Sequence, residues 1–179
     1  MKIRALFFAT PLIPALWVST LAYSKEEQML KVATFNVSME ATNYKALGMK
    51  PSDKVLQHVL STGEHPQVKN IAEIIQRINP DILLLNEFDY IADKRKGVEA
   101  FIENYLNVSQ QGLEPVDYPY TYVAPVNTGE PTTFDLDNNG KAEGIGGDAY
   151  GFGLYPGQYG MALLSKYPID VDGIRTFQT

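Results

Sequence analysis

Apolar and polar residues follow two different periods along this chain. Residues 30–37 alternate in character and are rich in β-branched and aromatic side chains, which predicts a strand. Residues 68–78 instead repeat apolar positions at helical spacing, and Asn79-Pro80 marks the end of that helix. The expected apolar face of the helix consists of Val68, Ile71, Ile74, Ile75 and Ile78. Residues 81–86 then contain an unbroken apolar run, which is typical of a strand covered on both faces.

Weaker patterns extend this order of strand, helix and strand. Further helices are expected at 52–60 and 98–106, and further strands at 118–126, 160–165 and 167–179. Residues 127–158 are rich in glycine, but their aromatic side chains indicate an ordered surface loop rather than a linker. The order of elements predicts an α/β fold, with a mixed sheet favoured over a purely parallel one.

Composition limits the chemistry that this chain can use. The sequence has 179 residues, which fits one domain or part of a larger one, and its formal net charge is −6. It has no cysteine, which excludes disulfides, iron–sulfur clusters and thiol nucleophiles. The acidic charge argues against broad non-specific binding of nucleic acid, but it is compatible with an enzyme that meets phosphate through a bound metal.

Residues 1–24 carry the pattern of a cleavable secretory signal. Lys2 and Arg4 form a basic start, an apolar stretch follows, and small residues close the segment. A retained membrane anchor is the alternative, although two prolines interrupt the apolar stretch. No other segment approaches the length of a membrane span. We therefore expect an exported protein, secreted or periplasmic, with one domain at 25–179.

Two polar residues stand where predicted strands end. Asn36 follows the apolar part of the first strand, and Glu87 follows the run within 81–86. Because α/β sheets place ligand sites at the carboxyl edge of their strands, both side chains are candidates for one site. Carboxylate and amide oxygens suit a hard divalent cation, which can polarise a phosphate ester and activate water. Taken alone, the same residues also fit a solvated glutamate and a turn-forming asparagine.

The segments around these residues form a longer pattern. They are KVATFNV at 31–37, INPDILLLNE at 78–87 and QYGMALLSKYPI at 158–169. In order and spacing they resemble the endonuclease/exonuclease/phosphatase superfamily of metal-dependent phosphoesterases, which includes deoxyribonuclease-like enzymes. The resemblance implies a two-sheet α/β sandwich with helices outside. It also implies that Glu87 ligates Mg²⁺ or Mn²⁺, that Asn36 orients the phosphate and catalytic groups, and that Tyr159 contacts substrate.

The same resemblance implies hydrolysis of a phosphodiester or a phosphomonoester. The substrate would be nucleic acid, a phosphomonoester or a phospholipid headgroup. Two later parts of the family's pattern, an Asp-x-Asn at a strand end and a terminal Asp-His pair, have no counterpart in this sequence. In the family those residues activate water and stabilise the phosphate in the transition state. We therefore expect an incomplete, N-terminal portion of the sandwich, from a truncated reading frame or a fragment, that is inactive alone.

A second candidate metal site lies in the glycine-rich loop. Asp135, Asp137 and Asn139 match the spacing D-x-[DN]-x-[DN]-G, which is the first half of a calcium loop. The twelfth position lacks the usual glutamate, and Glu143 and Asp148 are close enough in sequence to complete a non-standard site. A turn rich in Asp and Asn, without any cation, fits the same composition.

A different class of function follows from this second site. The chain could be a non-catalytic exported binding domain that calcium stabilises, with residues 144–160 as its contact surface and Tyr150, Tyr155 and Tyr159 as anchors. The expected cofactors are therefore Mg²⁺ or Mn²⁺ for hydrolysis, with Ca²⁺ as an open alternative. The sequence leaves the substrate and the oligomeric state open.

Overall fold

Four strands form one mixed sheet in the computed structural model, which describes residues 29–176. The strands are β1 (Val32–Met39), β2 (Ile82–Phe88), β3 (Tyr120–Val123) and β4 (Met161–Ser165), in the spatial order β1-β2-β4-β3. β1 and β2 run parallel, whereas β4 runs antiparallel to both of its neighbours. The expected α/β fold with a mixed sheet is therefore confirmed. The predicted secretory signal at 1–24 lies outside the described residues.

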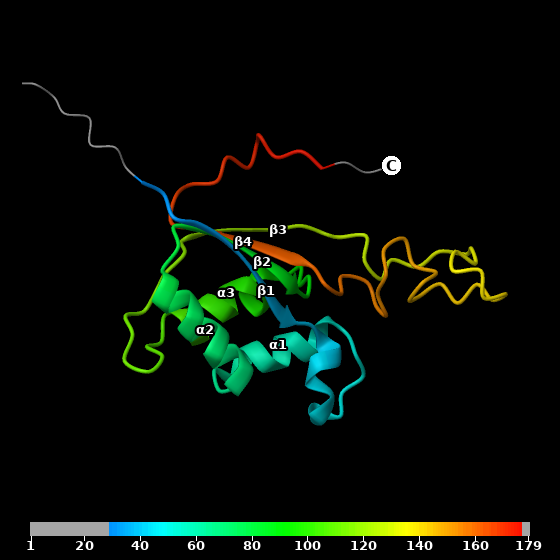
Figure 1. Cartoon of the computed structure of the whole chain (residues 1–179), viewed down its shortest axis with the longest axis horizontal. Helices are drawn as coiled ribbons and strands as arrows, with labels where there is room; N and C mark the ends of the chain where they lie inside the picture. Colours follow the sequence, from blue (N-terminus) through cyan, green and yellow to red (C-terminus); the bar gives the residue numbers. More distant parts are fainter. Residues whose placement is uncertain (1–28, 177–179) are drawn as a thin grey trace, which may run out of the picture.

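The helices α1, α2 and α3 lie on one side of this sheet (Figure 1). In chain order the helical elements are η1 (Ala41–Leu47), α1 (Asp53–Thr62), α2 (Pro66–Ile78), η2 (Lys94–Lys96), α3 (Val98–Phe101) and η3 (Ile102–Leu106). α2 begins with Pro66 and ends at Asn79, a left-handed cap whose N–H donates to Ile75 O. α3 and η3 together form the helix expected at 98–106. None of these helices within residues 29–176 combines the length and the apolar character needed to cross a bilayer.

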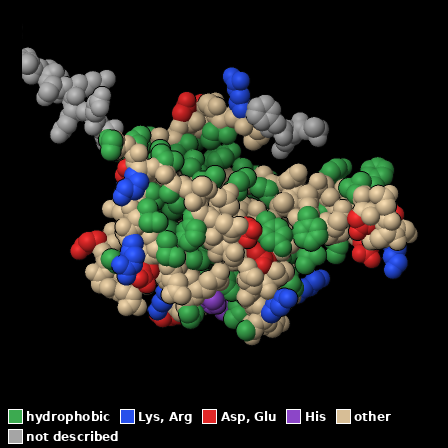
Figure 2. Space-filling model, viewed as in Figure 1, with side chains coloured by type: hydrophobic (Ala, Val, Ile, Leu, Met, Phe, Trp, Pro, Cys, Tyr) green, Lys and Arg blue, Asp and Glu red, His purple; other side chains and the backbone are tan. Residues whose placement is uncertain are grey.

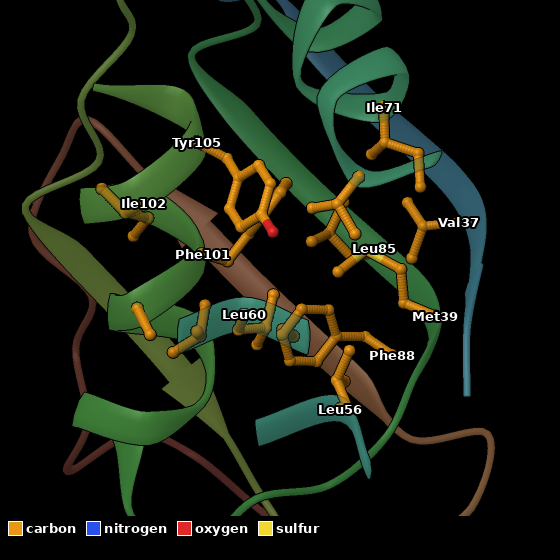
Figure 3. Close-up of a cluster of buried hydrophobic side chains, with 14 of the residues drawn as sticks. Val37, Met39, Leu56, Leu60, Ile71, Leu85, Phe88, Phe101, Ile102 and Tyr105 are labelled. Atoms are coloured by element: carbon orange, nitrogen blue, oxygen red, sulfur yellow. The ribbon is translucent and has the colours of Figure 1, made fainter. Parts of the chain in front are cut away.

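The main core lies between the sheet and these helices (Figure 3). β1 contributes Val37 and Met39, and β2 contributes Leu85 and Phe88, each at most 2% exposed. The helices contribute large side chains to the same cluster, including Leu56, Leu60, Ile71, Phe101 and Tyr105. Met39 and Phe88 are the last residues of their strands, so burial of this cluster holds the carboxyl ends of β1 and β2 against the helices.

The buried face of α2 is rotated relative to the predicted one. Ile74 and Ile78 are 41% and 47% exposed, whereas Ala72 and Gln76 are buried. Gln76 faces inward because its side chain donates to two backbone carbonyls within residues 106–110 and accepts from one N–H there. The assignment of Ile74 and Ile78 to the buried face was therefore wrong. A polar side chain that satisfies buried backbone groups stands on that face instead.

The sheet face turned away from the helices is only partly covered. Leu84 in β2 and Leu163 in β4 are half-buried, while Val32 and Met161 on the same face are 65% and 47% exposed. The expectation that the apolar run within 81–86 is covered on both faces is therefore wrong for the part of the chain that the structure describes. The reason is that α1, α2 and α3 all pack against the opposite face.

The residues after β4 do not form the strand expected at 167–179. Their described part, up to residue 176, contains bends and a turn but no strand. Asp170 accepts a hydrogen bond from Gly173 N–H at 3.2 Å, which closes the turn. The expectation was therefore wrong for residues 167–176, because the aspartate side chain offers the backbone a partner that competes with a ladder.

Residues 127–158 form an irregular arm that projects from the end of the sheet (Figure 1). Isolated bridges join Thr128 to Gly151, Pro131 to Ala149 and Gly146 to Gly153. At the base of the arm, backbone packs directly on backbone, and a Cβ at Gly129 would lie 1.8 Å from Tyr155 O. These contacts make the arm an ordered surface segment rather than a linker.

Adjacent alanine substitutions on α2 test the rotated face. Ile75→Ala removes a side chain that is 2% exposed, so we expect it to lower the free energy of unfolding by about 2–5 kcal/mol. Ile74→Ala, at its 41% exposed neighbour, is the matched control and should lower that free energy by less than about 1 kcal/mol. Urea unfolding followed by circular dichroism measures both variants. Equal losses would contradict the assigned face.

Candidate functional site

The parallel pair β1–β2 ends in an irregular step. The last paired residues are Asn36 with Asn86 and then Met39 with Phe88. Three steps along β1 therefore match two along β2. Ser38 and Glu87 lie within this mismatch and have left-handed backbones, at φ 49° and φ 55°. Such conformations are disfavoured for residues with a Cβ, and they persist only where the surrounding structure enforces them.

Ser38 joins the two site residues that the sequence predicts. Its Oγ lies 3.3 Å from Asn36 Oδ1 and 3.3 Å from Glu87 Oε2. The sequence interpretation missed Ser38, although a signal for it exists. Side chains two residues apart on a strand point to the same face, and Ser38 follows Asn36 by two. Asn36 and Glu87 are therefore brought together, through one hydroxyl group, at the carboxyl edge of the parallel pair.

The hydrogen bonds of Asn36 determine which end of its amide is free. Its Oδ1 accepts from the Ser38 N–H at 3.1 Å as well as from the Ser38 hydroxyl. Because only an acceptor can face that N–H, the free end is the Nδ2 group, which has no acceptor within residues 29–176. Asn36 is exposed, so this NH₂ group can donate to a ligand at the edge of the sheet.

Glu87 offers carboxylate oxygen to the same edge. Its Oε2 contacts the Ser38 hydroxyl, while its Oε1 has no hydrogen-bond donor among the described residues. No lysine or arginine of the described chain forms an ion pair with it. Mg²⁺ and similar hard cations prefer oxygen ligands and are often held by one or two carboxylates plus substrate phosphates. The oxygen ligands at this edge therefore fit a divalent cation.

Tyr159 lies within electrostatic reach of Glu87, on the segment that leads into β4. Its backbone is left-handed, at φ 58°, and its N–H donates to Asp89 Oδ1 at 3.2 Å. Burial, above all, raises the pKa of its hydroxyl, and the carboxylates of Glu40, Glu87 and Asp89 add to that effect. The hydroxyl is therefore protonated at neutral pH and can donate a hydrogen bond to an anionic ligand.

Asp89 is a fully buried carboxylate directly behind this edge. It accepts hydrogen bonds from the Tyr155 hydroxyl at 2.5 Å and from the N–H groups of Ala41 and Tyr159. Burial raises the pKa of Asp89 to about 7, although its three donors oppose that shift. Tyr155, expected as a surface anchor, is only 7% exposed because its hydroxyl is engaged in this contact, so that expectation was wrong.

Three carboxylates meet in the arm. Carboxylate oxygens of Asp135, Asp137 and Asp148 all lie within 4.8 Å of one another. Asp148 is 1% exposed and accepts hydrogen bonds from the N–H groups of Glu143 and Leu136, at 2.8 and 2.7 Å. The Glu143 N–H foremost, and then the Leu136 N–H, lower the pKa of Asp148 because they stabilise its charged form.

Asn139 lies against this acidic group, because its N–H donates to Asp135 Oδ1 and to Asp137 Oδ1, both at 3.0 Å. Its Oδ1 accepts from Lys141 N–H at 2.9 Å and its Nδ2 donates to Asp137 Oδ2 at 3.0 Å, so its amide is engaged within the loop. Gly147 permits the close approach, since a Cβ there would lie 2.7 Å from Asp137 Oδ2. The structure thus brings Asp135 and Asp137 together with Asp148, one of the two residues named from the sequence as able to complete the site.

Acidic side chains gather in two places on the face shown in Figure 2, beside the end of β1 and at the tip of the arm. Aromatic side chains of the arm are exposed as well: Phe134, Tyr150 and Phe152 are 63%, 68% and 63% exposed. Of the residues expected as anchors, Tyr150 is therefore on the surface, whereas Tyr159 is half-buried.

The fold and the edge of the parallel pair define an α/β protein with a polar site at its strand ends, in which the Glu87 carboxylate lies near the Ser38 hydroxyl and the Asn36 amide. A model of the Endonuclease/Exonuclease/phosphatase family matches residues 33–179. Because the match spans most of the chain, the protein belongs to this family. No curated protein and no solved structure gave a match.

Membership in this family indicates a hydrolase of the phosphoesterase or nuclease type. The family acts on phosphate-ester substrates and generally uses divalent metals. The matched range includes Asn36, Glu87 and Tyr159 as well as the arm. The single four-stranded sheet, with its helices on one face, is consistent with an incomplete form of the family's α/β fold.

Replacing Asp148 by asparagine tests the hydrogen bonds within the acidic group of the arm. Because the pKa of Asp148 is lower in the folded protein than in the unfolded chain, its charged form stabilises the fold above the unfolded pKa. That contribution is lost as the pH falls through the folded-state pKa. We therefore expect wild type to lose more stability than Asp148→Asn on acidification from about pH 6 to about pH 2.

Urea unfolding at a series of pH values measures this difference. Asp117→Asn, at an exposed carboxylate without a hydrogen bond in the described chain, is the control and should follow wild type. Parallel curves for wild type and Asp148→Asn would contradict the assigned hydrogen bonds.

Proposed function

We propose that the chain is an exported phosphoesterase domain that hydrolyses a phosphodiester or a phosphomonoester with the help of a divalent cation. The observation that carries this proposal is the contact of Ser38 Oγ with both Asn36 and Glu87, at the carboxyl edge of two parallel strands. Family membership supports the class of reaction. The basic start and apolar stretch of residues 1–24 support export, to the cell exterior or the periplasm.

Glu87 is the residue proposed to hold Mg²⁺ or Mn²⁺. Its Oε1 is free of hydrogen-bond donors in the described chain, and the Ser38 hydroxyl beside Oε2 adds a further oxygen. When bound, such a cation polarises the phosphate and offsets the charge that develops in the transition state. A single carboxylate leaves most of the coordination shell to water and phosphate oxygens, which is common for Mg²⁺ sites that act on phosphates.

We assign two hydrogen-bond donors to the same site as Glu87. The Asn36 Nδ2 group is oriented by the bonds of its own Oδ1 to Ser38. The Tyr159 hydroxyl is protonated at neutral pH, as an ordinary tyrosine is, and burial raises its pKa further. Both donors can bind non-bridging oxygens of a phosphate group. Donors that are held in place before the reaction need no reorientation when charge develops, which is the main source of electrostatic stabilisation in such sites.

The donors and the cation recognise the phosphate itself rather than the group attached to it. Nucleic acid, a phosphomonoester and a phospholipid headgroup therefore all fit the proposed site. The net charge of −6 disfavours long duplex nucleic acid among these, because such binding relies on clustered lysine and arginine.

Glu87→Gln tests the proposal without requiring turnover. The substitution keeps the size of the side chain but removes the charge that attracts a cation, so we expect the affinity for Mn²⁺ to fall about tenfold or more. Calorimetry and electron paramagnetic resonance of Mn²⁺ measure this affinity. Any Mg²⁺-dependent cleavage of phosphodiester or phosphomonoester substrates should fall in parallel, by about a hundredfold or more.

Glu114→Gln is the matched control, since Glu114 is exposed and has no hydrogen bond or ion pair in the described chain. It should bind Mn²⁺ as wild type does. The proposal is refuted by Mn²⁺ affinity that is unchanged in Glu87→Gln, or by hydrolysis that survives both this substitution and chelation.

A second candidate function rests on the acidic group of the arm. Three carboxylates within 4.8 Å of one another repel, and a cation between them relieves that repulsion. We propose Ca²⁺ as that cation, because flexible loops rich in carboxylate and carbonyl oxygen suit its larger coordination shell. The chain would then be a non-catalytic exported binding domain, with the exposed Tyr150 as an anchor on a calcium-stabilised arm.

Calcium should raise the melting temperature of wild type, because a ligand that binds only the folded state adds stability. The gain is about 2.7 kcal/mol when free Ca²⁺ is about 100 times its Kd. Asp135→Asn and Asp137→Asn should each remove most of this effect, whereas Asp170→Asn, an exposed aspartate outside the arm, should retain it. Scanning calorimetry with and without Ca²⁺ measures the difference.

An unchanged calcium effect in both arm variants would rule out this site. Calcium stabilisation in a protein that neither binds Mn²⁺ through Glu87 nor hydrolyses phosphate esters would favour the binding function over the phosphoesterase.

A further inference from the structure

Three polar side chains are buried directly behind the candidate site. Glu40, Asp89 and Gln158 are at most 2% exposed. Neither carboxylate forms an ion pair with a lysine or arginine of the described chain. Burial of an unpaired carboxylate is costly unless hydrogen bonds replace its water. The hydrogen-bond donors of Glu40 and Asp89 therefore identify the chain segments that these carboxylates connect.

Asp89 connects the end of β1 to the segment before β4. Its Oδ2 accepts from Ala41 N–H at 3.0 Å and from the Tyr155 hydroxyl at 2.5 Å. Its Oδ1 accepts from Tyr159 N–H at 3.2 Å. The Ala41 N–H also donates to the Tyr155 hydroxyl oxygen, at 2.9 Å, so the two partners of Oδ2 are themselves linked. Both oxygens of Asp89 are thus occupied by fixed donors.

Glu40 makes a second connection to the same segment. Its Oε2 accepts from Thr42 N–H at 2.8 Å and from Gln158 Nε2 at 2.7 Å. The amide oxygen of Gln158 in turn accepts from Leu154 N–H at 2.7 Å. The backbone carbonyl of Gln158 accepts from the Thr128 hydroxyl at the base of the arm. Both polar atoms of the Gln158 side chain therefore form a hydrogen bond, which fixes the orientation of its amide group.

Both connections end on the turn that carries Tyr159. This turn needs strained or glycine backbone, because Tyr159 has φ 58° and Gly157 has φ 84°. It also packs without space against β2, where a Cβ at Gly160 would lie 2.7 Å from Phe88 O. A left-handed tyrosine keeps this conformation only while its surroundings impose it. Asp89 and Glu40 supply that constraint from behind.

We propose that Glu40 and Asp89 are positioning residues that clamp the 155–159 turn onto the ends of β1 and β2, so that the Tyr159 hydroxyl is presented to the phosphate beside Glu87. This inference rests on the proposed phosphoesterase function and extends it to residues that do not touch substrate. Such a clamp acts on the transition state through Tyr159. It would leave cation binding at Glu87 unaffected.

Asp89→Asn breaks the clamp with little change in shape. The Ala41 N–H and the Tyr159 N–H face opposite oxygens of Asp89, so an amide must turn its own NH₂ group toward one of them. Gln158→Leu breaks the other connection, because it removes the bonds to Glu40 and to Leu154 N–H. The two variants disturb the same turn through different residues. If one of them fails to fold, the other still tests the positioning role.

We expect both variants to lower kcat about tenfold or more, because a small displacement of a donor costs much of its effect. KM and the Mn²⁺ affinity should stay within about threefold of wild type, since Glu87 and Asn36 are untouched. Hydrogen exchange of the Tyr159 amide should become about tenfold faster or more, because its acceptor is lost or displaced. Steady-state kinetics, Mn²⁺ titration and exchange measured by nuclear magnetic resonance give these quantities.

Gln76→Leu is the matched control. Gln76 is a buried glutamine that bonds the backbone of residues 106–110, away from the turn. It should lower the melting temperature while kcat and the exchange of the Tyr159 amide follow wild type. If Asp89→Asn and Gln158→Leu behave in this way too, they are merely structural and the positioning role is overturned.

The outcomes separate this inference from the function on which it rests. Unchanged exchange of the Tyr159 amide, or faster exchange with unchanged kcat, overturns the clamp while Mn²⁺ binding at Glu87 stands. If the chain binds Mn²⁺ but does not hydrolyse phosphate esters, the readout is the broadening of the Tyr159 ring signals by Mn²⁺ instead of kcat. This broadening should weaken in both variants. A wild type that neither binds Mn²⁺ nor hydrolyses overturns the proposed function, and the positioning role falls with it.

Discussion

The parallel pairing of β1 with β2 is the interaction on which both the core and the candidate site depend. It brings two carboxyl ends to one edge, and the burial of Met39 and Phe88 fixes those ends against the helices. The register there is irregular, and Ser38 and Glu87 carry left-handed backbones that an isolated strand would not keep. The geometry of the edge is therefore maintained by the apolar contacts behind it.

Sequence reasoning recovers two elements through the period that burial on one face imposes. The alternation in 30–37 and the helical repeat in 68–78 both correspond to elements of the structure, β1 and α2. The orientation of α2 could not be derived in the same way, because Gln76 faces inward to satisfy a backbone that is distant in sequence. The segment 167–176 was misjudged for a related reason, since an aspartate closes a turn that competes with pairing.

Sequence reasoning likewise finds some residues of the candidate site and misses others. Asn36 and Glu87 are visible in the sequence because each is a polar residue placed after an apolar strand. Asp89 and Glu40 also follow strands, yet nothing in the pattern separates a buried carboxylate from a solvated one. What buries them is the turn before β4, whose donors come from residues more than 60 positions away, as with Tyr155 and Asp89. Long-range hydrogen bonds of this kind leave no local period to detect.

The base and the tip of the arm are subject to different physical constraints. At the base, Gly129 meets the carbonyl of Tyr155 with no room for a side chain, and the Thr128 hydroxyl donates to the backbone carbonyl of Gln158, so the base packs directly on the turn behind the site. At the tip, three carboxylates converge, and the arm also carries exposed aromatic side chains. A cation at the tip would relieve the repulsion between the carboxylates there. Any effect of that cation on the strand edge would have to pass along the backbone of the base. The base is thus tied to the edge of β1 and β2 by packing that needs no metal, whereas order at the tip is the part that a cation can change.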